Sequence, residues 1–139
     1  MGSMVIRRGV AADISAVLDF WEAHEGPAGG ATSNRPALET LLDTDLGALL
    51  IAEDGELVGT VIVAFDGWRG AMYRLVTHTD RRRQGIARAL VAAGEEQLRQ
   101  QGARRVHLMV LSENDGGRSA WESFGYAHDA HDVRYVKML

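Results

Sequence analysis

The sequence contains no cysteine, which excludes disulfides, thiolate metal sites and a cysteine nucleophile. No apolar run approaches the roughly 20 residues of a membrane-spanning helix. The N-terminus also lacks the basic-then-apolar layout of a secretion signal. We therefore expect a cytoplasmic protein that does not engage a membrane.

Only two of the 139 residues are proline and 46% are apolar, which predicts one globular domain over residues 4–139. Residues 1–3 are interpreted as an expression remnant.

An excess of positive charge is missing too. The formal net charge is −4 and the pI is about 5.7. A surface with this balance repels polyanions as a whole, which disfavours nucleic acid as a partner. Positive charge on a surface with this net charge can only occur in local basic patches.

Hydrophobic periodicity divides the chain into alternating elements. The order β-α-α-β-β-β-α-β-α-β predicts an α/β (α+β) protein with a mixed sheet flanked by helices. A glycine-rich segment separates the first two helices, and Asn34 or Ser33 is expected to cap the second. The pattern predicts strands over 4–9, 71–77, 103–111 and 133–138, two strands within 48–65 joined by a two-residue turn at Asp54-Gly55, and helices over 11–23, 35–44, 82–101 and 116–125.

The helix predicted over 82–101 has an unexpected charge at its start. A helix N-terminus carries unpaired amides and a partial positive charge, yet the arginines 81–83 crowd it. A bound anion would offset this repulsion, because small Gly85 and Ala87 let a ligand approach the backbone and arginines neutralise phosphate. The alternative is a solvated arginine cluster partly neutralised by Asp80, and these residues alone favour neither interpretation.

Several spaced motifs share one arrangement with a known family. Arg82, Gly85 and Ala87 fit the pattern of Arg or Gln, two residues, Gly, one residue, and Gly or Ala. LVTHTDRRRQGIA fits a strand, turn and helix, with Thr79 where a proline often stands, and HLMVLSENDGGRSAWESFGY fits the next strand and helix. This arrangement resembles the GNAT superfamily of acyl-CoA-dependent N-acyltransferases. The resemblance covers nearly the whole chain and implies a mostly antiparallel sheet.

The resemblance implies acetyl-CoA as co-substrate, held by two backbone segments. In the family, amides of the motif loop hold the pyrophosphate, and the preceding strand pairs with the pantetheine arm beside a splay that opens the acetyl slot. An asparagine before the last helix contacts the cofactor arm, although a helix cap is the alternative role for Asn114. The implied cofactor residues are Leu75, Val76, Thr77, Arg82, Arg83, Gln84, Gly85, Ala87, Arg88, Asn114 and Trp121.

Trp121 departs from the family pattern. Members often carry a tyrosine at this position, four residues before the closing Gly-aromatic pair, where its hydroxyl can protonate the departing thiolate. An indole N–H is too weak an acid for that role. We therefore expect Trp121 to pack against the cofactor, with Ser119, Ser123, Tyr126 or water as the alternative proton donor.

The resemblance implies direct attack of a neutral amine on the thioester, without a covalent enzyme intermediate. Such a reaction needs a proton acceptor, and the residues we select are Glu22, Glu25 and Tyr73. His24, Asp66 and His107 are further candidates, each with an ordinary structural role as its alternative.

The acceptor is expected to be a cationic small-molecule or peptide amine. Glu22, Glu25, Asp43 and Asp45 lie in or near the first two helices, which resemble the family's acceptor side. A homodimer is compatible with the sequence. His128 and His131 lack a third ligand at a typical spacing, so we expect no metal site. The alternative functions are a non-catalytic acyl-CoA sensor and an RNA-binding protein, and the acidic balance disfavours the second.

Overall fold

The computed structural model describes residues 3–25, 34–45 and 47–139. The predicted glycine-rich segment lies outside these ranges, apart from its two ends. Residues 1–2 of the predicted remnant also lie outside them. The chain divides into two compact units, residues 1–108 and 109–139. In chain order the first unit contains β1 (Val5–Arg8), η1 (Ala11–Asp13), α1 (Ile14–His24), α2 (Arg35–Leu42), β2 (Gly47–Glu53), β3 (Leu57–Phe65), β4 (Gly70–Thr77), η2 (Thr79–Arg81), α3 (Ile86–Gln101) and β5 (Val106–His107).

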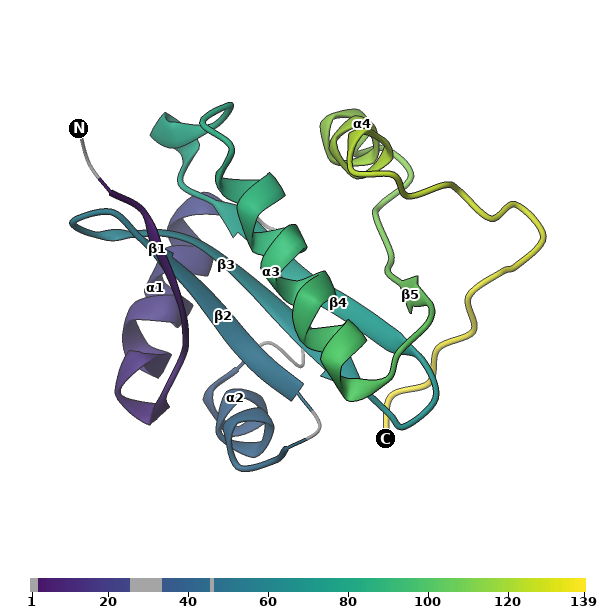
Figure 1. Cartoon of the computed structure of the whole chain (residues 1–139), viewed down its shortest axis with the longest axis horizontal. Coiled ribbons are helices and arrows are strands. Elements are labelled where there is room, and N and C mark those ends of the chain that lie inside the picture. The colour runs from purple at the N-terminus through teal and green to yellow at the C-terminus, as the bar shows by residue number, and fades with distance from the viewer. Residues whose placement is uncertain (1–2, 26–33, 46) are drawn as a thin grey trace. The chain divides into compact units, whose positions relative to one another are not determined.

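The first unit is built on one five-stranded sheet in the order β1-β2-β3-β4-β5. The first three strand pairs are antiparallel, and β4 pairs with β5 in parallel. Helix α3 covers one face of this sheet, and α1 and α2 cover the other (Figure 1). The predicted mixed, mostly antiparallel sheet is therefore confirmed. Asn34 caps α2 by accepting the Ala37 N–H at 3.0 Å. It is one of the two residues expected to cap this helix.

Apolar side chains fill both faces of the sheet. On one face Trp21 and Phe20 of α1 belong to a buried cluster with Leu49 and Val76. On the other face α3 lies close to the strands, since a Cβ added at Gly94 would lie only 2.8 Å from Met72 Cε. This close packing fixes α3 along β3 and β4, and so fixes where α3 begins.

Helix α3 begins later than its periodicity predicts. The sequence predicts a start at Arg82, whereas the structure places it at Ile86. Arg82 is extended (φ −66°, ψ 153°), and Arg83 and Gly85 have positive φ, so a right-handed helix cannot pass through these residues. The arginines therefore lie in the loop ahead of the helix and not in its first turn.

The β2–β3 connection is longer than predicted. The expected two-residue turn at Asp54-Gly55 is a three-residue connection, because β3 begins only at Leu57. Gly55 has φ 74°, a value that glycine adopts readily. The register shift between Ala52 and Glu53 accommodates the extra residue.

The second unit contains α4 (Asp115–Ser123), which Asn114 caps by accepting the Gly117 N–H at 2.9 Å. The strand predicted over 133–138 is wrong, because the structure assigns no strand there. Val133 and Tyr135 are exposed, so their alternation has no buried face to support it.

The strand predicted over 103–111 is shortened to β5. Only Val106 and His107 pair with β4, and Met109 and Leu111 are exposed. An apolar run therefore did not identify a buried strand here, because a strand also needs a partner for its backbone. None of the described helices is long and apolar enough to span a membrane.

Candidate functional site

The chain reverses between β4 and α3 through the loop of residues 78–85. His78 caps η2 by accepting the Asp80 N–H on Nδ1 at 3.1 Å. Arg83 and Gly85 then have φ of 66° and 80°, and Gly85 is the N-cap of α3. Left-handed backbone favours glycine, so Gly85 suits this position, whereas Arg83 occupies it at a conformational cost.

The start of α3 presents backbone amides to open space. The Ala89 N–H donates to the Gly85 carbonyl at 3.0 Å as the first bond of the helix. Helix geometry gives the preceding amides, including those of Ile86 and Ala87, no acceptor within the helix. A Cβ added at Gly85 would meet no atom of the described residues within 4 Å. The space in front of Gly85 is therefore open, and the helix dipole favours an anion there.

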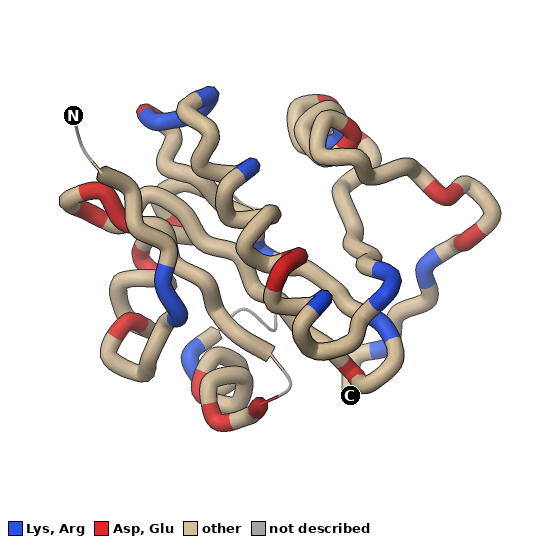
Figure 2. The backbone as a smooth tube through the Cα atoms, in the orientation of Figure 1, with Lys and Arg blue, Asp and Glu red and all other residues tan. Residues whose placement is uncertain are grey.

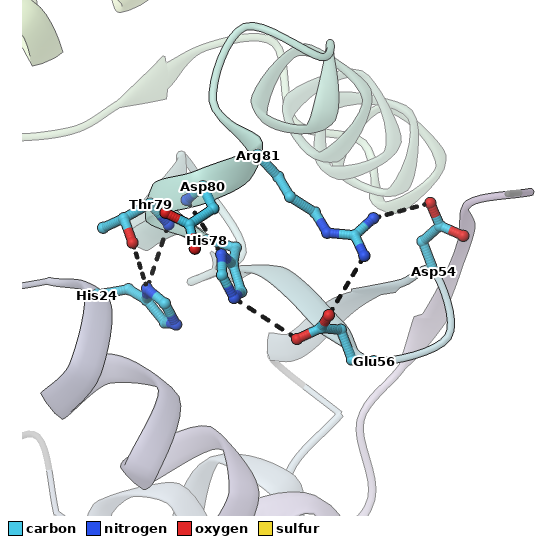
Figure 3. A network of polar contacts seen from close by, with 7 residues as sticks. All are labelled: His24, Asp54, Glu56, His78, Thr79, Asp80 and Arg81. Atoms are coloured by element: carbon cyan, nitrogen blue, oxygen red, sulfur yellow. Dashed lines mark hydrogen bonds and ion pairs between the residues drawn. The ribbon is translucent and has the colours of Figure 1, made fainter.

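The three arginines of this loop have different surroundings. Arg81 forms ion pairs with Asp54 at 3.1 Å and Glu56 at 3.2 Å, on the connection between β2 and β3 (Figure 3). Arg82 and Arg83 are exposed, and across residues 3–25, 34–45 and 47–139 no ion pair involves either side chain. Two cationic side chains beside open amides fit a pyrophosphate group.

Two imidazole rings lie against the same loop. His24, at the end of α1, accepts the Thr79 N–H on Nδ1 at 3.2 Å, and its ring centroid lies 4.2 Å from that of His78 (Figure 3). Because Nδ1 of each ring accepts a backbone N–H, each ring needs an unprotonated Nδ1. Burial lowers the pKa of His24, and the charge of the neighbouring Arg82 lowers it further. His24 therefore supports the loop through an Nδ1 that accepts the Thr79 N–H.

A β-bulge interrupts β4 in its second half. The register passes from Thr60 opposite Val76 to Ile62 opposite Tyr73, so two residues of β4 oppose one of β3. Arg74, within the bulge, has φ 55°. Such a bulge changes the direction in which the following backbone groups point, and those groups lead directly to the loop ahead of α3.

Strand β4 pairs with β5 only at its beginning. Gly70 and Ala71 have partners on β5, and the ladder between these two strands extends no further among the described residues. The segment 75–77, to which the resemblance assigns the pantetheine arm, lies beyond that ladder. The geometry is compatible with this assignment, and the contact itself stays a prediction.

The three predicted catalytic residues have different surroundings. Glu25 follows α1 and forms an ion pair with Arg74 in the bulge. Glu22 is exposed on α1. Tyr73 lies on β4 beside the bulge, with 45% of its surface exposed. The ion pair therefore joins Glu25 to β4, and a proton-transfer role stays a prediction for all three.

Two further candidate bases lie at the other end of β4. Asp66 accepts the Trp68 and Arg69 N–H groups, both at 2.8 Å, and thereby forms the turn between β3 and β4. The Arg69 and Trp68 amides hold the pKa of Asp66 below its usual value. His107 is exposed on β5. The contacts of Asp66 indicate a structural role in that turn.

The second unit carries the remaining predicted cofactor residues. Asn114 caps α4, so the cap alternative is confirmed, and a cofactor contact stays a prediction. Trp121 is half-buried and packs edge-on against Phe124 and Tyr126, with ring centroids 5.8 and 5.0 Å away. Asp129 accepts the His131 N–H at 3.1 Å. Over the described ranges no group of three His, Cys, Asp or Glu side chains could hold a metal ion.

Comparison with known proteins decides what this arrangement belongs to. The model of the acetyltransferase (GNAT) family matches residues 15–126. The chain belongs to this family. An acetyltransferase of Pectobacterium atrosepticum is 37% identical over 117 residues, which cover 82% of this chain and 81% of that protein. An acetyltransferase of Sodalis glossinidius is 40% identical over 90 residues, which cover 64% and 63%.

Solved structures confirm the GNAT fold. An aminoglycoside N-acetyltransferase in complex with CoA has a TM-score of 0.83 and 17% identity, covering 100% of this chain and 97% of its own. An aminoglycoside 6'-N-acetyltransferase from Acinetobacter haemolyticus has a TM-score of 0.81 and 15% identity, covering 97% and 99%. The expected family, fold class and acetyltransferase activity are therefore confirmed.

Sequence reasoning missed three residues that support the β4 bulge or the loop of residues 78–85. His78 caps η2, Arg74 lies in the bulge, and Thr60 is a polar residue within the buried core. A charged residue in the otherwise uncharged stretch AMYRLVT was a usable signal for Arg74. Nothing in the periodicity distinguishes Thr60 from an ordinary strand residue.

The open backbone at Gly85 leads to a prediction about CoA binding. Replacing Gly85 with Glu should lower CoA affinity by more than about tenfold, because a side chain strains the left-handed backbone and its charge repels the pyrophosphate. Isothermal calorimetry with CoA measures this change.

Gly102 provides the matched control. It also has positive φ (101°), at the C-terminal end of α3, and a Cβ there would meet no atom of the described residues within 4 Å. Gly102→Glu should lower stability similarly but leave CoA affinity unchanged. Equal affinities in the two variants would contradict an anion site at Gly85.

The lowered pKa of His24 leads to a prediction about pH. Because the unfolded chain takes up the proton first, His24 stabilises the fold above about pH 6.5, and this stability is lost as pH falls towards the folded pKa. Urea unfolding at about pH 7.5 and 5.5 should show a smaller pH-dependent loss for His24→Asn than for the unaltered protein. His107→Asn, at an exposed position, should behave like the unaltered protein. An unchanged loss in His24→Asn would show that His24 does not cause it.

Proposed function

We propose that this GNAT acetyltransferase transfers the acetyl group of acetyl-CoA to a primary amine by direct attack in a ternary complex. The observation that carries the proposal is the open, electropositive backbone at Gly85, at the end of the loop that follows the bulged strand β4. The family membership supports the acyl donor. The protein supplies positions for two substrates, and the chemistry requires no covalent enzyme intermediate.

The donor would lie along the end of β4 and the start of α3. The pyrophosphate would be held by the backbone amides of Arg83, Gln84, Gly85, Ala87 and Arg88. The side chains of Arg82 and Arg83 would add positive charge. The backbone of 75–77 would hold the pantetheine arm. A bound acetyl-CoA supplies a thioester whose carbonyl carbon is open to a nucleophile.

The transfer itself balances without a further reagent. The amine nitrogen attacks the thioester carbonyl carbon, the carbon–sulfur bond breaks, and the sulfur leaves as a thiolate. The amine loses one proton and the thiolate gains one. A backbone N–H near Val76 or Thr77 would stabilise charge on the carbonyl oxygen. Glu22, Glu25, Tyr73 or an intervening water would receive the amine proton.

The acceptor is proposed to be a cationic small-molecule or peptide amine. Exposed carboxylates occur on α1 at Glu22 and after α2 at Asp43 and Asp45, whereas the loop ahead of α3 is basic (Figure 2). This asymmetry attracts ammonium groups to the acidic side. Several proteins with the same fold are aminoglycoside acetyltransferases, and aminoglycosides are cationic amines.

A thiol-release assay with acetyl-CoA and a panel of amines tests the reaction. Turnover that depends on the amine is expected. Tight CoA binding with no turnover for any neutral, cationic or anionic amine would favour the alternative, a non-catalytic acyl-CoA sensor.

Trp121 is predicted not to act as a general acid, because its indole N–H does not ionise in the accessible pH range. Trp121→Phe should retain most of the turnover number, and Trp121→Tyr should retain or raise it. Steady-state kinetics measure both. A large loss in the Phe variant, at unchanged acetyl-CoA affinity, would show that the indole N–H takes part in the reaction.

Charge at Glu22 is predicted to matter for the acceptor and not for the donor. Glu22→Gln should raise the KM of a cationic amine up to about fivefold and leave that of acetyl-CoA unchanged, since exposed charge pairs contribute about 1 kcal/mol or less. Glu96→Gln, at an exposed position of α3, is the control and should alter neither value. A best acceptor that is neutral or anionic would contradict this prediction.

A further inference from the structure

The bulge of β4 is surrounded by an unusual set of contacts. Arg74 has φ 55°, a left-handed conformation that a residue with a Cβ adopts at a cost. Such a conformation persists only where the surroundings hold it in place. The contacts that could do so come from α1 and β3.

These contacts join three residues in a closed ring. The indole N–H of Trp21 donates to Thr60 Oγ1 at 2.8 Å, and the Thr60 hydroxyl donates to the Arg74 carbonyl at 3.1 Å. The Arg74 guanidinium returns to Trp21, with its central carbon 5.2 Å from the ring centroid. Trp21 and Thr60 are buried, so each hydrogen bond in the ring is shielded from water.

An ion pair extends this ring to the end of α1. The Arg74 guanidinium contacts Glu25 Oε1, and the two side chains are only 12% and 18% exposed. Burial of the guanidinium lowers the pKa of Arg74. Removing one partner of such a pair leaves the other charge buried and uncompensated. The Arg74 and Glu25 side chains are therefore held together. Glu25 is also the C-cap of α1, which ties this helix to the bulge.

The second carboxylate oxygen of Glu25 takes no part in this ion pair. Oε2 is buried and has no hydrogen-bond donor among the described residues. A general base must reach the proton it removes, either directly or through one water. The contact with Arg74 therefore fixes one oxygen of Glu25, and a role of the other oxygen in proton transfer stays a prediction.

We infer that Arg74 is a positioning residue: with Glu25, Trp21 and Thr60 it holds the β4 bulge, and the bulge sets the direction of the Leu75 and Val76 backbone groups towards the acetyl thioester. The inference rests on the proposed function, which places the donor along this backbone. Arg74 itself does not touch the reacting atoms. Its side chain acts through the direction of the strand.

The test compares Arg74→Met with a control of the same kind. Arg7 also joins segments distant in the sequence, through ion pairs with Asp13 at 2.7 Å and Glu53 at 2.5 Å, at the far edge of the sheet. Arg7→Met should lower the melting temperature but leave kcat unchanged. Arg74→Met should lower kcat by about ten- to a hundredfold, as expected for a misplaced reacting group, with acetyl-CoA affinity within about twofold of the unaltered protein.

A spectroscopic measurement separates positioning from stability. The carbonyl carbon NMR shift of isotope-labelled acetyl-CoA should move on binding to the unaltered protein and to Arg7→Met, because a backbone N–H polarises the carbonyl. In Arg74→Met this shift should return towards the value of free acetyl-CoA. This readout does not depend on an identified amine.

Two more variants test the role of Arg74 independently of Arg74→Met. Arg74→Gly relieves the left-handed strain but removes the contacts, so it should lose as much kcat as Arg74→Met. Arg74→Lys keeps the charge and should restore part of it. If the Met variant fails to fold, the Gly and Lys variants decide.

Two outcomes distinguish a failure of the proposed function from a failure of the inference about Arg74. Unaltered protein that does not bind acetyl-CoA would overturn the proposed function together with this inference. Unaltered protein that binds and shifts the carbonyl signal, while Arg74→Met and Arg74→Gly match it in shift and kcat, would overturn the inference alone.

Discussion

The left-handed backbone at Gly85 is the constraint on which the candidate site depends. It ends the loop that follows β4 and begins α3 in one step, so the first amides of the helix face open space. The close contact of Gly94 with Met72 then holds α3 against the sheet. A rigid helix whose N-terminus is fixed at a strand end can bind a phosphate group without a lysine or a metal ion directed at it.

Two sets of contacts hold the backbone on either side of Val76. Upstream, the ring of Trp21, Thr60 and Arg74 surrounds the bulge. Downstream, the His24 and His78 rings accept backbone N–H groups of the loop. Helix α1 contributes to both through Trp21 and His24, so it is central to the geometry of the site. Carbonyl polarisation and pyrophosphate binding would thus both depend on the same helix.

Much of this organisation follows from the sequence, because periodicity and turn residues act locally. The five paired strands, the helices and the Asn34 and Asn114 caps were predictable in kind. The start of α3 was not, since apolar spacing continues through Arg82 although positive φ at Gly85 stops the helix. The Arg74–Glu25 pair joins residues 49 positions apart, and no local pattern encodes such a partner. The expected strand over 133–138 failed because alternation indicates a strand only where one face is buried.

We propose that the pyrophosphate of CoA lies at the start of α3. Amide proton–nitrogen correlation spectra recorded during a titration with CoA test it most directly, because each backbone N–H reports its own hydrogen bonding. We expect the largest shifts for residues 84–88 and no shift for Gly102 and Ala103 at the opposite end of the helix. Shifts concentrated at Gly102, or none within 84–88 at saturating CoA, would contradict it.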